Sequence, residues 1–469
     1  MTRKSFIFTL VCILAMTALV SVTCAAKQVD IEVWSSGGIN PEAPTALGAG
    51  MKTALERFRE LNPDINLKWN VQVAGAGQTP EAMQKLMTAI AAGNPPDVTI
   101  LDRFLAASWA ARGAIQSIDK YLSPDTPLVE DNMPPGAWDE LVGLDGKLYG
   151  SPVLSDNTGF WSLYYNRDHF RRVGMDENSP PTTWVDLITA AKKLTKYGAD
   201  GEIEILGYRP YGDWAGELNG LARTNQARFV SDDGKTILLD SDEVVETVEF
   251  IVKIVDELGG IDKVSRFLSA AQPGAQDPFV MGDVAMYHMG EWFLVDMARF
   301  APDVDFDVTF LPTPSGSQFT AWIGGWAWTM PAGVRNPRES VRVIEYLASR
   351  EFVEAFVEGA QSFEREMGRA PVLPGALYFV YNDIAKTVNL PLLENTSPNV
   401  AKALDHFVTA RDRAYAVYAR EKNIVPAELW AAQGRALEAA LYHQSTPYDA
   451  LHKETEKLQK TLDDFLKRF

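Results

Sequence analysis

Strand-like and helix-like segments alternate along this chain, and this alternation constrains the fold more than any other feature. Residues 29–34 alternate apolar and polar side chains, and residues 47–61 then carry apolar side chains at helical spacing. The same order returns with strand-like segments at 66–73 and 97–101 and helix-like segments at 80–92 and 104–112. Such alternation predicts a parallel sheet with helices on its faces.

A second run of the same pattern begins after Tyr149. Residues 160–165 have the composition of a buried strand, and residues 183–197 have helical spacing. From Glu339 the pattern is almost wholly helical, with predicted helices at 401–420, 427–442 and 448–469. Because 469 residues are enough for more than one domain, the sequence predicts two α/β lobes.

The cysteines, the net charge and the histidines exclude several classes of function. Both cysteines, Cys12 and Cys24, lie near the amino terminus, so the remaining chain has no thiol for a disulfide, a zinc site or catalysis. The net charge of -18 disfavours nucleic acid as a partner. The histidines include no i, i+4 pair, and phosphate-binding loops and nucleophile elbows are absent, so no metal or cofactor is expected.

The first 26 residues have the three parts of a secretory signal. Arg3 and Lys4 precede an uncharged apolar run from 6 to 22, and small residues follow it. A retained membrane helix is the alternative, although the run is at the short limit for spanning a bilayer. Two modes of cleavage stay open, because Cys24 ends a loose lipoprotein motif while cleavage before Lys27 also fits. We therefore expect export to the periplasm or cell surface, with or without a lipid anchor on Cys24.

Eight segments in fixed order resemble the family 1 extracellular solute-binding proteins, which are the sugar-capturing subunits of ABC importers. Each segment is weak evidence alone, and the ordered series is strong. The segments are Ile31-Glu32-Val33-Trp34, residues 83–101, residues 146–152, Tyr164-Tyr165-Asn166-Arg167, residues 181–184, residues 279–286, Gly324-Gly325-Trp326 and residues 336–340.

This resemblance implies an α/β fold of two lobes, with a ligand cleft at the interdomain hinge. The expected boundaries are a signal at 1–26, an N-terminal lobe of 27–158 plus 324–373, and a C-terminal lobe of 159–323 plus 374–469. It implies a monomer that is not an enzyme and that passes a carbohydrate to ABC permease transmembrane subunits. Glycines at or beside the crossings are expected to absorb the hinge rotation. They are Gly159, Gly324, Gly325 and Gly375.

A neutral sugar has hydroxyls at its edge and C–H patches on its faces, so its site needs aromatic planes and polar groups. Trp292 occupies a place where the family commonly has an aromatic ring under a sugar; ordinary core packing is the alternative. Asp102-Arg103-Phe104 matches a motif of maltodextrin-binding members whose acid and base bond sugar hydroxyls. A solvated ion pair is the alternative for Asp102 and Arg103. Because these residues follow a strand, we expect them to face the cleft.

Two further segments supply candidates through the resemblance. Pro210 and Tyr211 align with a pair whose tyrosine packs on sugar, and Trp214 lies just beyond. Gly325 and Trp326 resemble an element that offers a backbone donor and an aromatic plane.

The tryptophans around Trp326 have a structural alternative. Trp322, Trp326 and Trp328 alternate along one predicted strand, which would place all three on one face by packing alone. The remaining candidates match family positions or lie at a predicted crossing, and a helical tryptophan such as the last is commonly core. They are Arg369, Asn157, Trp161 and Trp430.

Two rival functions stay open. An exported glycoside hydrolase needs two carboxyl groups across a sugar bond, which the 62 acidic residues do not exclude. A binding protein for an anionic glycerophosphate-type solute would share the fold but needs cations in the cleft. The chain also departs from maltodextrin-binding members, with Gly38, Ile39 and Gly159 at positions of charged ligand contacts. We therefore expect a carbohydrate bound in a different way.

Overall fold

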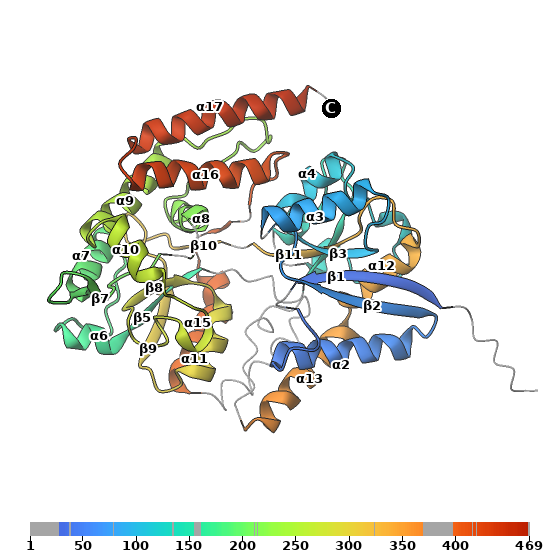
Figure 1. The fold of residues 1–469 in the computed structure, drawn as a ribbon, viewed down its shortest axis with the longest axis horizontal. Helices are drawn as coiled ribbons and strands as arrows, with labels where there is room; N and C mark the ends of the chain where they lie inside the picture. The colour runs from blue at the N-terminus through green and yellow to red at the C-terminus, as the bar shows by residue number, and fades with distance from the viewer. Residues whose placement is uncertain are drawn as a thin grey trace, which may run out of the picture.

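The computed structural model has two α/β lobes, which lie side by side in Figure 1. It describes residues 28–467 except 37–38, 78, 134–135, 154–160, 211, 213, 323, 369–396, 415 and 419. The predictions for the export signal at 1–26, Cys24, Asn157, Gly159, Tyr211, Arg369 and Gly375 lie outside the described residues. In the described part of the chain, no helix is both long enough and apolar enough to cross a membrane.

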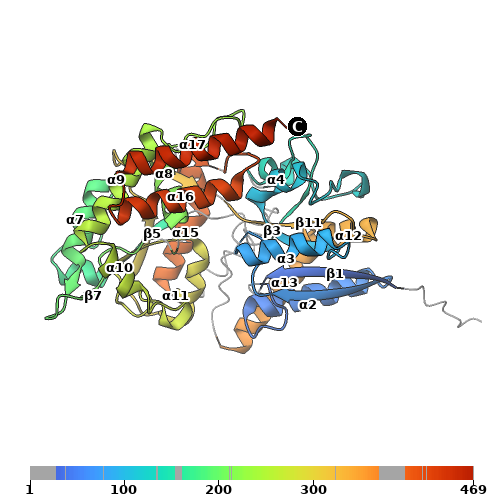
Figure 2. The ribbon, with the colours of Figure 1, turned by 45° about the horizontal axis from the view of Figure 1, so that its top comes forward.

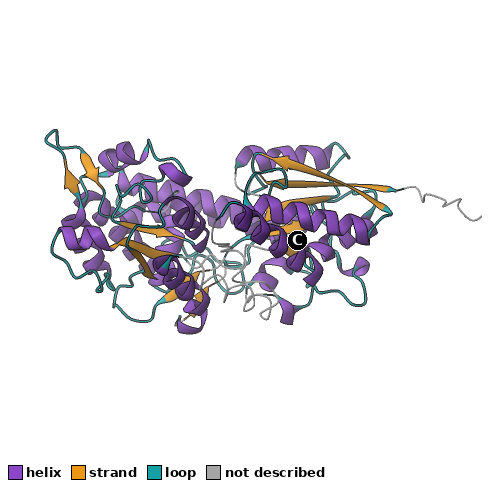
Figure 3. Ribbon diagram, turned by 90° about the horizontal axis from the view of Figure 1, so that it is seen from below, coloured by secondary structure: helices purple, strands orange, loops and turns teal. Residues whose placement is uncertain are grey.

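Buried apolar side chains gather into two separate cores. One core takes its residues from 31–153 and 327–360, and the other takes them from 161–311 and 400–462. Figure 3 shows the corresponding groups of strands and helices at the two ends of the molecule. The chain therefore passes between lobes more than once.

The sheet of the first lobe places the end of β3 beside β11. Its strands lie in the order β2-β1-β3-β11-β4, with β1 parallel to β2 and β3 as predicted. β11 runs antiparallel to β3 and sets Trp326 opposite Asp102. The strands are β1 (Val29–Ser36), β2 (Ile65–Gln72), β3 (Val98–Asp102), β4 (Gly150–Pro152) and β11 (Trp326–Thr329).

Two of the helices that cover this sheet pack closely because glycines lie at their contact. A Cβ on Gly50 of α2 would come 2.7 Å from the carbonyl oxygen of Phe356, and one on Gly359 of α13 would come 2.3 Å from Thr53 Oγ1. A larger residue at either position would push the helices apart. The helices of this lobe are α2 (Ala46–Leu61), α3 (Pro80–Ala91), α4 (Ala106–Ala111), α5 (Ala137–Leu141), α12 (Pro337–Leu347) and α13 (Arg350–Glu366).

The sheet of the second lobe corrects the prediction of a parallel sheet there. β5 runs antiparallel to both neighbours in the order β8-β5-β9. Strand and helix alternation does not fix strand direction when long segments between strands return the chain to either end of the sheet. The strands of this lobe are β5 (Ser162–Asn166), β6 (Lys196–Tyr197), β7 (Ile203–Ile205), β8 (Met286–Met289) and β9 (Phe306–Phe310).

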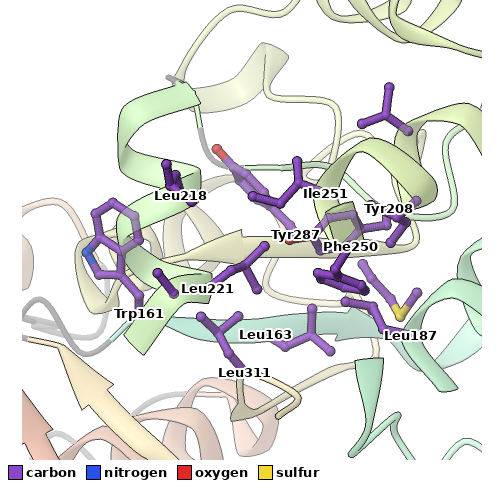
Figure 4. Close-up of a cluster of buried hydrophobic side chains, with 14 of the residues drawn as sticks. Trp161, Leu163, Leu187, Tyr208, Leu218, Leu221, Phe250, Ile251, Tyr287 and Leu311 are labelled. Atoms are coloured by element: carbon purple, nitrogen blue, oxygen red, sulfur yellow. The ribbon is translucent and has the colours of Figure 1, made fainter. Parts of the chain in front are cut away.

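Side chains from the strands of the sheet and from several helices meet in the core of the second lobe. Figure 4 shows Leu163 of β5, Leu187 of α7, Leu221 of α8 and Phe250 of α9 converging. Trp184 stacks on Phe250 with ring centroids 4.4 Å apart. The helices are α6 (Arg167–Arg172), α7 (Trp184–Leu194), α8 (Trp214–Thr224), α9 (Asp242–Glu257), α10 (Ile261–Leu268), α11 (Leu294–Phe300), α15 (Pro398–Arg413), α16 (Pro426–Leu441) and α17 (Pro447–Leu466).

A separate pair of strands packs against the second lobe and corrects two predictions. β10 (Thr320–Trp322) pairs in parallel with β12 (Ala416–Tyr418), whereas β11 begins at Trp326 in another sheet. Trp322 is thus not on the strand of Trp326 and Trp328. The predicted helix at 401–420 ends at Arg413, because pairing with β10 draws the following residues into a strand.

α16 and α17 lie across one face of the molecule and approach the first lobe (Figure 2). The guanidinium carbon of Arg112, just after α4, lies 4.5 Å from the centre of the Phe465 ring on α17. Arg112 also donates to the carbonyl oxygen of Ile424 at 3.1 Å, and Ser108 Oγ donates to the same oxygen at 2.9 Å. These contacts fasten the segment before α16 to the first lobe.

One buried histidine predicts how stability depends on pH. His406 on α15 accepts from Arg413 Nη2 through Nδ1 at 2.9 Å, and its Nε2 lies 3.0 Å from Ser162 Oγ. Burial and the neighbouring Arg413 guanidinium lower the pKa of His406 to about 3, while Asp307 acts weakly the other way. The ring is therefore neutral in the folded protein.

Between about pH 6.5 and about pH 3 the unfolded chain binds a proton at this histidine that the folded protein does not, so stability falls as pH falls. Through His406 the wild type should lose about 2 kcal/mol of unfolding free energy between about pH 7 and pH 5. His406→Gln should not show this loss, as measured by urea unfolding. His443→Gln is the matched control, because the His443 side chain is 65% exposed. This variant should lose as much stability over that pH range as the wild type does. An equal pH slope in His406→Gln and the wild type would contradict this assignment.

Candidate functional site

Four charged side chains meet where the lobes join, and we call Asp102, Arg103, Glu140 and Arg420 the junction cluster. Two of them were predicted as ligand contacts. Asp102 ends β3, and Arg103 opens the 3₁₀ turn Arg103–Leu105 that follows. The Arg103 side chain is fully buried, and its Nε donates to Glu140 Oε2 at 2.8 Å. Arg103 is therefore held inside the first lobe by Glu140.

Arg420 joins the cluster from the segment that follows β12. Its Nη1 lies 2.8 Å from Asp102 Oδ1, and its Nε lies 3.0 Å from Glu140 Oε1. The Arg420 guanidinium carbon lies 4.9 Å from the centre of the Phe104 ring, so an aromatic face covers the cation. The junction cluster thus has two acids and two bases in alternating contact.

The cluster shifts the pKa of each acid in a different direction. Burial raises the pKa of Asp102, although Arg420 opposes this effect. Burial also acts to raise the pKa of Glu140, but Arg420 and Arg103 outweigh it and the net shift is downward. Glu140, which contacts both arginines, is the more strongly stabilised anion.

Two of the predicted hinge glycines, Gly324 and Gly325, are hydrogen-bonded to this cluster. The carbonyl oxygen of Gly324 accepts from Arg103 Nη2 at 2.5 Å, and that of Gly325 accepts from the backbone N–H of Arg103 at 2.9 Å. Gly325 also accepts from Arg420 Nη2 at 3.3 Å. Its φ of 143° lies in a region that favours glycine, so a side chain there would strain the connection between β10 and β11.

Trp326 and Trp430 lie beside the junction cluster. Trp326 is half-buried, and a Cβ on Gly75 would come 2.9 Å from its ring, so the indole covers that glycine. Trp430 of α16 lies 6.0 Å from Phe104, measured between ring centroids. Phe104, Arg420 and Trp430 line a pocket of about 20 Å³, together with polar residues of the second lobe. The structure therefore brings Asp102, Trp326 and Trp430 to one region.

Trp292 lies in the second lobe and its side chain is partly exposed. It follows β8 and is 39% exposed, while its neighbours Glu291 and Phe293 are buried. A Cβ on Gly290 would come 2.1 Å from the indole, so only glycine lets the ring lie in this position. The buried hydroxyl of Tyr164 donates to the carbonyl oxygen of Gly290 at 2.8 Å and fixes the loop. Trp292 is consequently held in place by its surroundings although its side chain is partly exposed.

Trp161 and Trp214 are more enclosed. Trp161 is 7% exposed and meets the edge of His288 at 4.9 Å between ring centroids. Trp214 begins α8 and packs partly buried against the core of the second lobe. Both positions agree with core packing.

The sequence prediction missed Glu140 and Arg420. Glu140 lies in the five-residue helix α5, and Arg420 lies in a segment predicted to be helical. Their contacts join residues 280 positions apart, so no local spacing could have identified the pair. Buried acids and bases are expected to pair, but the sequence does not show which partners meet.

Comparisons with known proteins agree with this architecture. The family model for bacterial extracellular solute-binding proteins matches residues 42–354. A maltooligosaccharide ABC transporter solute-binding lipoprotein of Streptococcus pneumoniae R6 is 23% identical over 351 residues, which cover 72% of this chain and 75% of the relative.

Solved structures show the same fold. CpMnBP1 with mannotriose bound superposes with a TM-score of 0.72 at 24% identity, covering 92% of this chain and 99% of that protein. An ABC substrate-binding protein of Listeria monocytogenes in complex with cycloalternan gives a TM-score of 0.69 at 21% identity, covering 93% and 99%. Because the family model spans well over half of its residues, this chain belongs to the bacterial extracellular solute-binding protein family.

Proposed function

We propose that this protein captures a neutral disaccharide or oligosaccharide between its lobes and delivers it to ABC permease transmembrane subunits. The observations that carry the proposal are the charge balance of the junction cluster and an exposed aromatic side chain in the second lobe. Arg103 and Arg420 both face carboxylates, and Trp292 offers an exposed ring held in place by buried neighbours. Such a surface suits the C–H faces and hydroxyls of a sugar.

The relatives support the same class of ligand. They include the maltooligosaccharide-binding lipoprotein of Streptococcus pneumoniae and the structures with mannotriose or cycloalternan bound. We infer that Trp292, Asp102 and Trp326 contact the ligand, with Gly325 as a backbone contact. Further proposed contacts are Arg103, Tyr211, Arg369, Asn157, Trp161, Trp214 and Trp430.

We also infer how the chain is processed and divided. The signal at 1–26 would be removed on export, with Cys24 as the lipid anchor if cleavage leaves it first. The N-terminal lobe would comprise 27–158 plus 324–373, and the C-terminal lobe 159–323 plus 374–469. A monomer without catalytic activity would close on its ligand as a hinge.

An anionic solute is the second candidate. An sn-glycerol-3-phosphate-binding periplasmic protein of Brucella abortus is 29% identical over 154 residues, which cover 32% of this chain and 35% of the relative. Two arginines that could serve such a ligand are already paired: Arg103 with Glu140, and Arg209, whose Nη1 lies 2.6 Å from Asp277 Oδ2. These carboxylates neutralise the positive charge of the arginines, which binding of a phosphate would require.

Titration calorimetry at low and high salt distinguishes the two candidates. We expect maltotriose or mannotriose to bind with an affinity that changes less than about twofold between about 0.05 and 0.5 M salt, because no net charge is paired. Binding of sn-glycerol-3-phosphate alone, with a steep loss at high salt, would favour the anionic ligand. Release of product from an aryl glycoside would instead identify a hydrolase.

Trp292→Ala should weaken binding of that sugar by about 1.5 to 3 kcal/mol, because a large aromatic plane is removed from the ligand face. The melting temperature without sugar should change little, since the side chain is 39% exposed. Phe300→Ala is the matched control, because Phe300 is 41% exposed on α11, directly after the turn that carries Trp292. Equal affinity in Trp292→Ala and the wild type would remove Trp292 from the site.

A further inference from the structure

The contacts of Asp102 fall on only one of its two carboxylate oxygens. Oδ1 accepts from the backbone N–H of Phe104 at 3.4 Å and lies 2.8 Å from Arg420 Nη1. Among the described residues, Oδ2 has no hydrogen-bond partner, and the side chain is 17% exposed. One oxygen is thus fixed while the other is available to solvent.

Arg420 is itself held on several sides. Its Nε donates to Glu140, its Nη2 donates to the carbonyl oxygen of Gly325, and the Phe104 ring covers its face. A guanidinium fixed in this way presents Nη1 to Asp102 in one orientation. The next residue, Glu421, pairs instead with Arg223 of α8 in the second lobe at 2.6 Å. Adjacent residues therefore fasten this segment to both lobes.

We propose that Arg420 is a positioning residue for ligand binding, which holds Oδ1 of Asp102 and leaves Oδ2 to accept a hydrogen bond from a ligand hydroxyl. This inference rests on the proposed binding of a carbohydrate. It adds a residue from the segment after β12 that does not itself touch the ligand. Within the described residues, the charged groups around Asp102 are Arg420, Glu140 and Arg103, and of these only Arg420 contacts its carboxylate.

The pH dependence of binding separates positioning from a merely structural role. Burial already raises the pKa of Asp102, and Arg420 opposes that rise. In Arg420→Met the carboxylate loses its counter-ion beside Glu140, so its pKa should rise further and the neutral form should become populated. Affinity should then fall about tenfold at about pH 6.5 and recover as pH rises to about 8.5. Wild-type affinity should change less than about twofold over that range.

Three further variants make the assignment specific. Arg420→Lys should restore much of the affinity and its flat pH profile, because the cation remains. Arg420→Met combined with Asp102→Asn should be weak at every pH, because no carboxylate is left to titrate at 102. Arg342→Met is the matched control, because Arg342 also pairs with an aspartate, Asp64, at 2.7 Å, and neither residue belongs to the junction cluster. This variant should bind sugar as the wild type does.

The experiment is calorimetry with maltotriose and mannotriose, together with NMR titration of the Asp102 carboxyl in ligand-free protein. A raised pKa of Asp102 in Arg420→Met with pH-dependent affinity supports the inference. Flat, wild-type-like affinity in Arg420→Met overturns it even though the wild type binds sugar. If neither sugar binds the wild type, the proposed function fails for these ligands, while an unchanged Asp102 pKa in Arg420→Met would still overturn the positioning role.

Discussion

Glu140→Gln should destabilise the protein by about 3 to 5 kcal/mol, because the junction cluster then has two buried guanidinium groups and a single carboxylate, that of Asp102. The Glu140 carboxylate accepts from Arg103 Nε at 2.8 Å and from Arg420 Nε at 3.0 Å, and its side chain is 3% exposed. The neutral amide keeps the shape but loses the charge, and its NH₂ group would point a donor at a donor.

Urea unfolding followed by circular dichroism at neutral pH measures this effect. Glu60→Gln is the matched control, because Glu60 pairs with Arg57 on the surface and is 67% exposed, so its loss should change stability by less than about 0.5 kcal/mol. Since the folded pKa of Glu140 is lowered, its contribution is present above the unfolded pKa and is lost as pH falls through the folded pKa. The difference in unfolding free energy between the wild type and Glu140→Gln should therefore become smaller at acidic pH. A change below about 1 kcal/mol at neutral pH would show that the junction cluster adds little to stability.

Local pattern predicts much of the fold. Helical spacing over 47–61 identified α2, which runs from Ala46 to Leu61, and the apolar run at 97–101 identified β3. These elements bury one face or both faces, so the pattern directly records the burial. Strand direction in the second lobe and the split between β10 and β11 depend on pairing across the chain, which the pattern does not record.

The candidate site divides in the same way. Asp102 could be placed because it follows a recognisable strand, and Trp326 because Gly325-Trp326 resembles an element of the family; the register then sets the two opposite each other. Glu140 and Arg420 could not, since a buried charge becomes distinctive only when its partner is known. The proposed ligand contact at Trp292 in the second lobe stays a prediction, which the affinity of Trp292→Ala tests.

Arg223→Met should also destabilise the protein by about 3 to 5 kcal/mol, because it leaves the buried carboxylate of Glu421 without its counter-ion. Arg223 of α8 donates Nη1 and Nη2 to the two oxygens of Glu421 at 2.6 and 2.7 Å, and its Nη1 donates to the carbonyl oxygen of Ala227 at 2.9 Å. The two side chains are 1% and 8% exposed. Glu421 also accepts from the backbone N–H of Phe229 at 3.2 Å, so the pair fixes a loop as well as α8.

Arg228→Met is the matched control for unfolding in urea, since Arg228 pairs with Asp232 on the surface and is 43% exposed. Burial acts to raise the pKa of Glu421, but Arg223 outweighs it and the net shift is downward. Stability from the pair is therefore present above the unfolded pKa and lost as pH falls through the folded pKa. In Arg223→Met the carboxylate loses its counter-ion and keeps the effect of burial, opposed by the backbone N–H of Phe229, so the deficit in unfolding free energy should shrink on acidification.

The double variant Arg223→Met with Glu421→Leu decides whether the charge or the contact matters. Replacing both partners removes the uncompensated carboxylate, so most of the lost stability should return even though the hydrogen bonds are gone. If the double variant is no more stable than Arg223→Met, the pair contributes through its hydrogen bonds to the loop.

Because Glu421 is adjacent to Arg420, the double variant should also hold the segment after β12 less tightly. Weaker sugar binding by a folded double variant would then indicate that Arg420 needs this second anchor to hold Asp102.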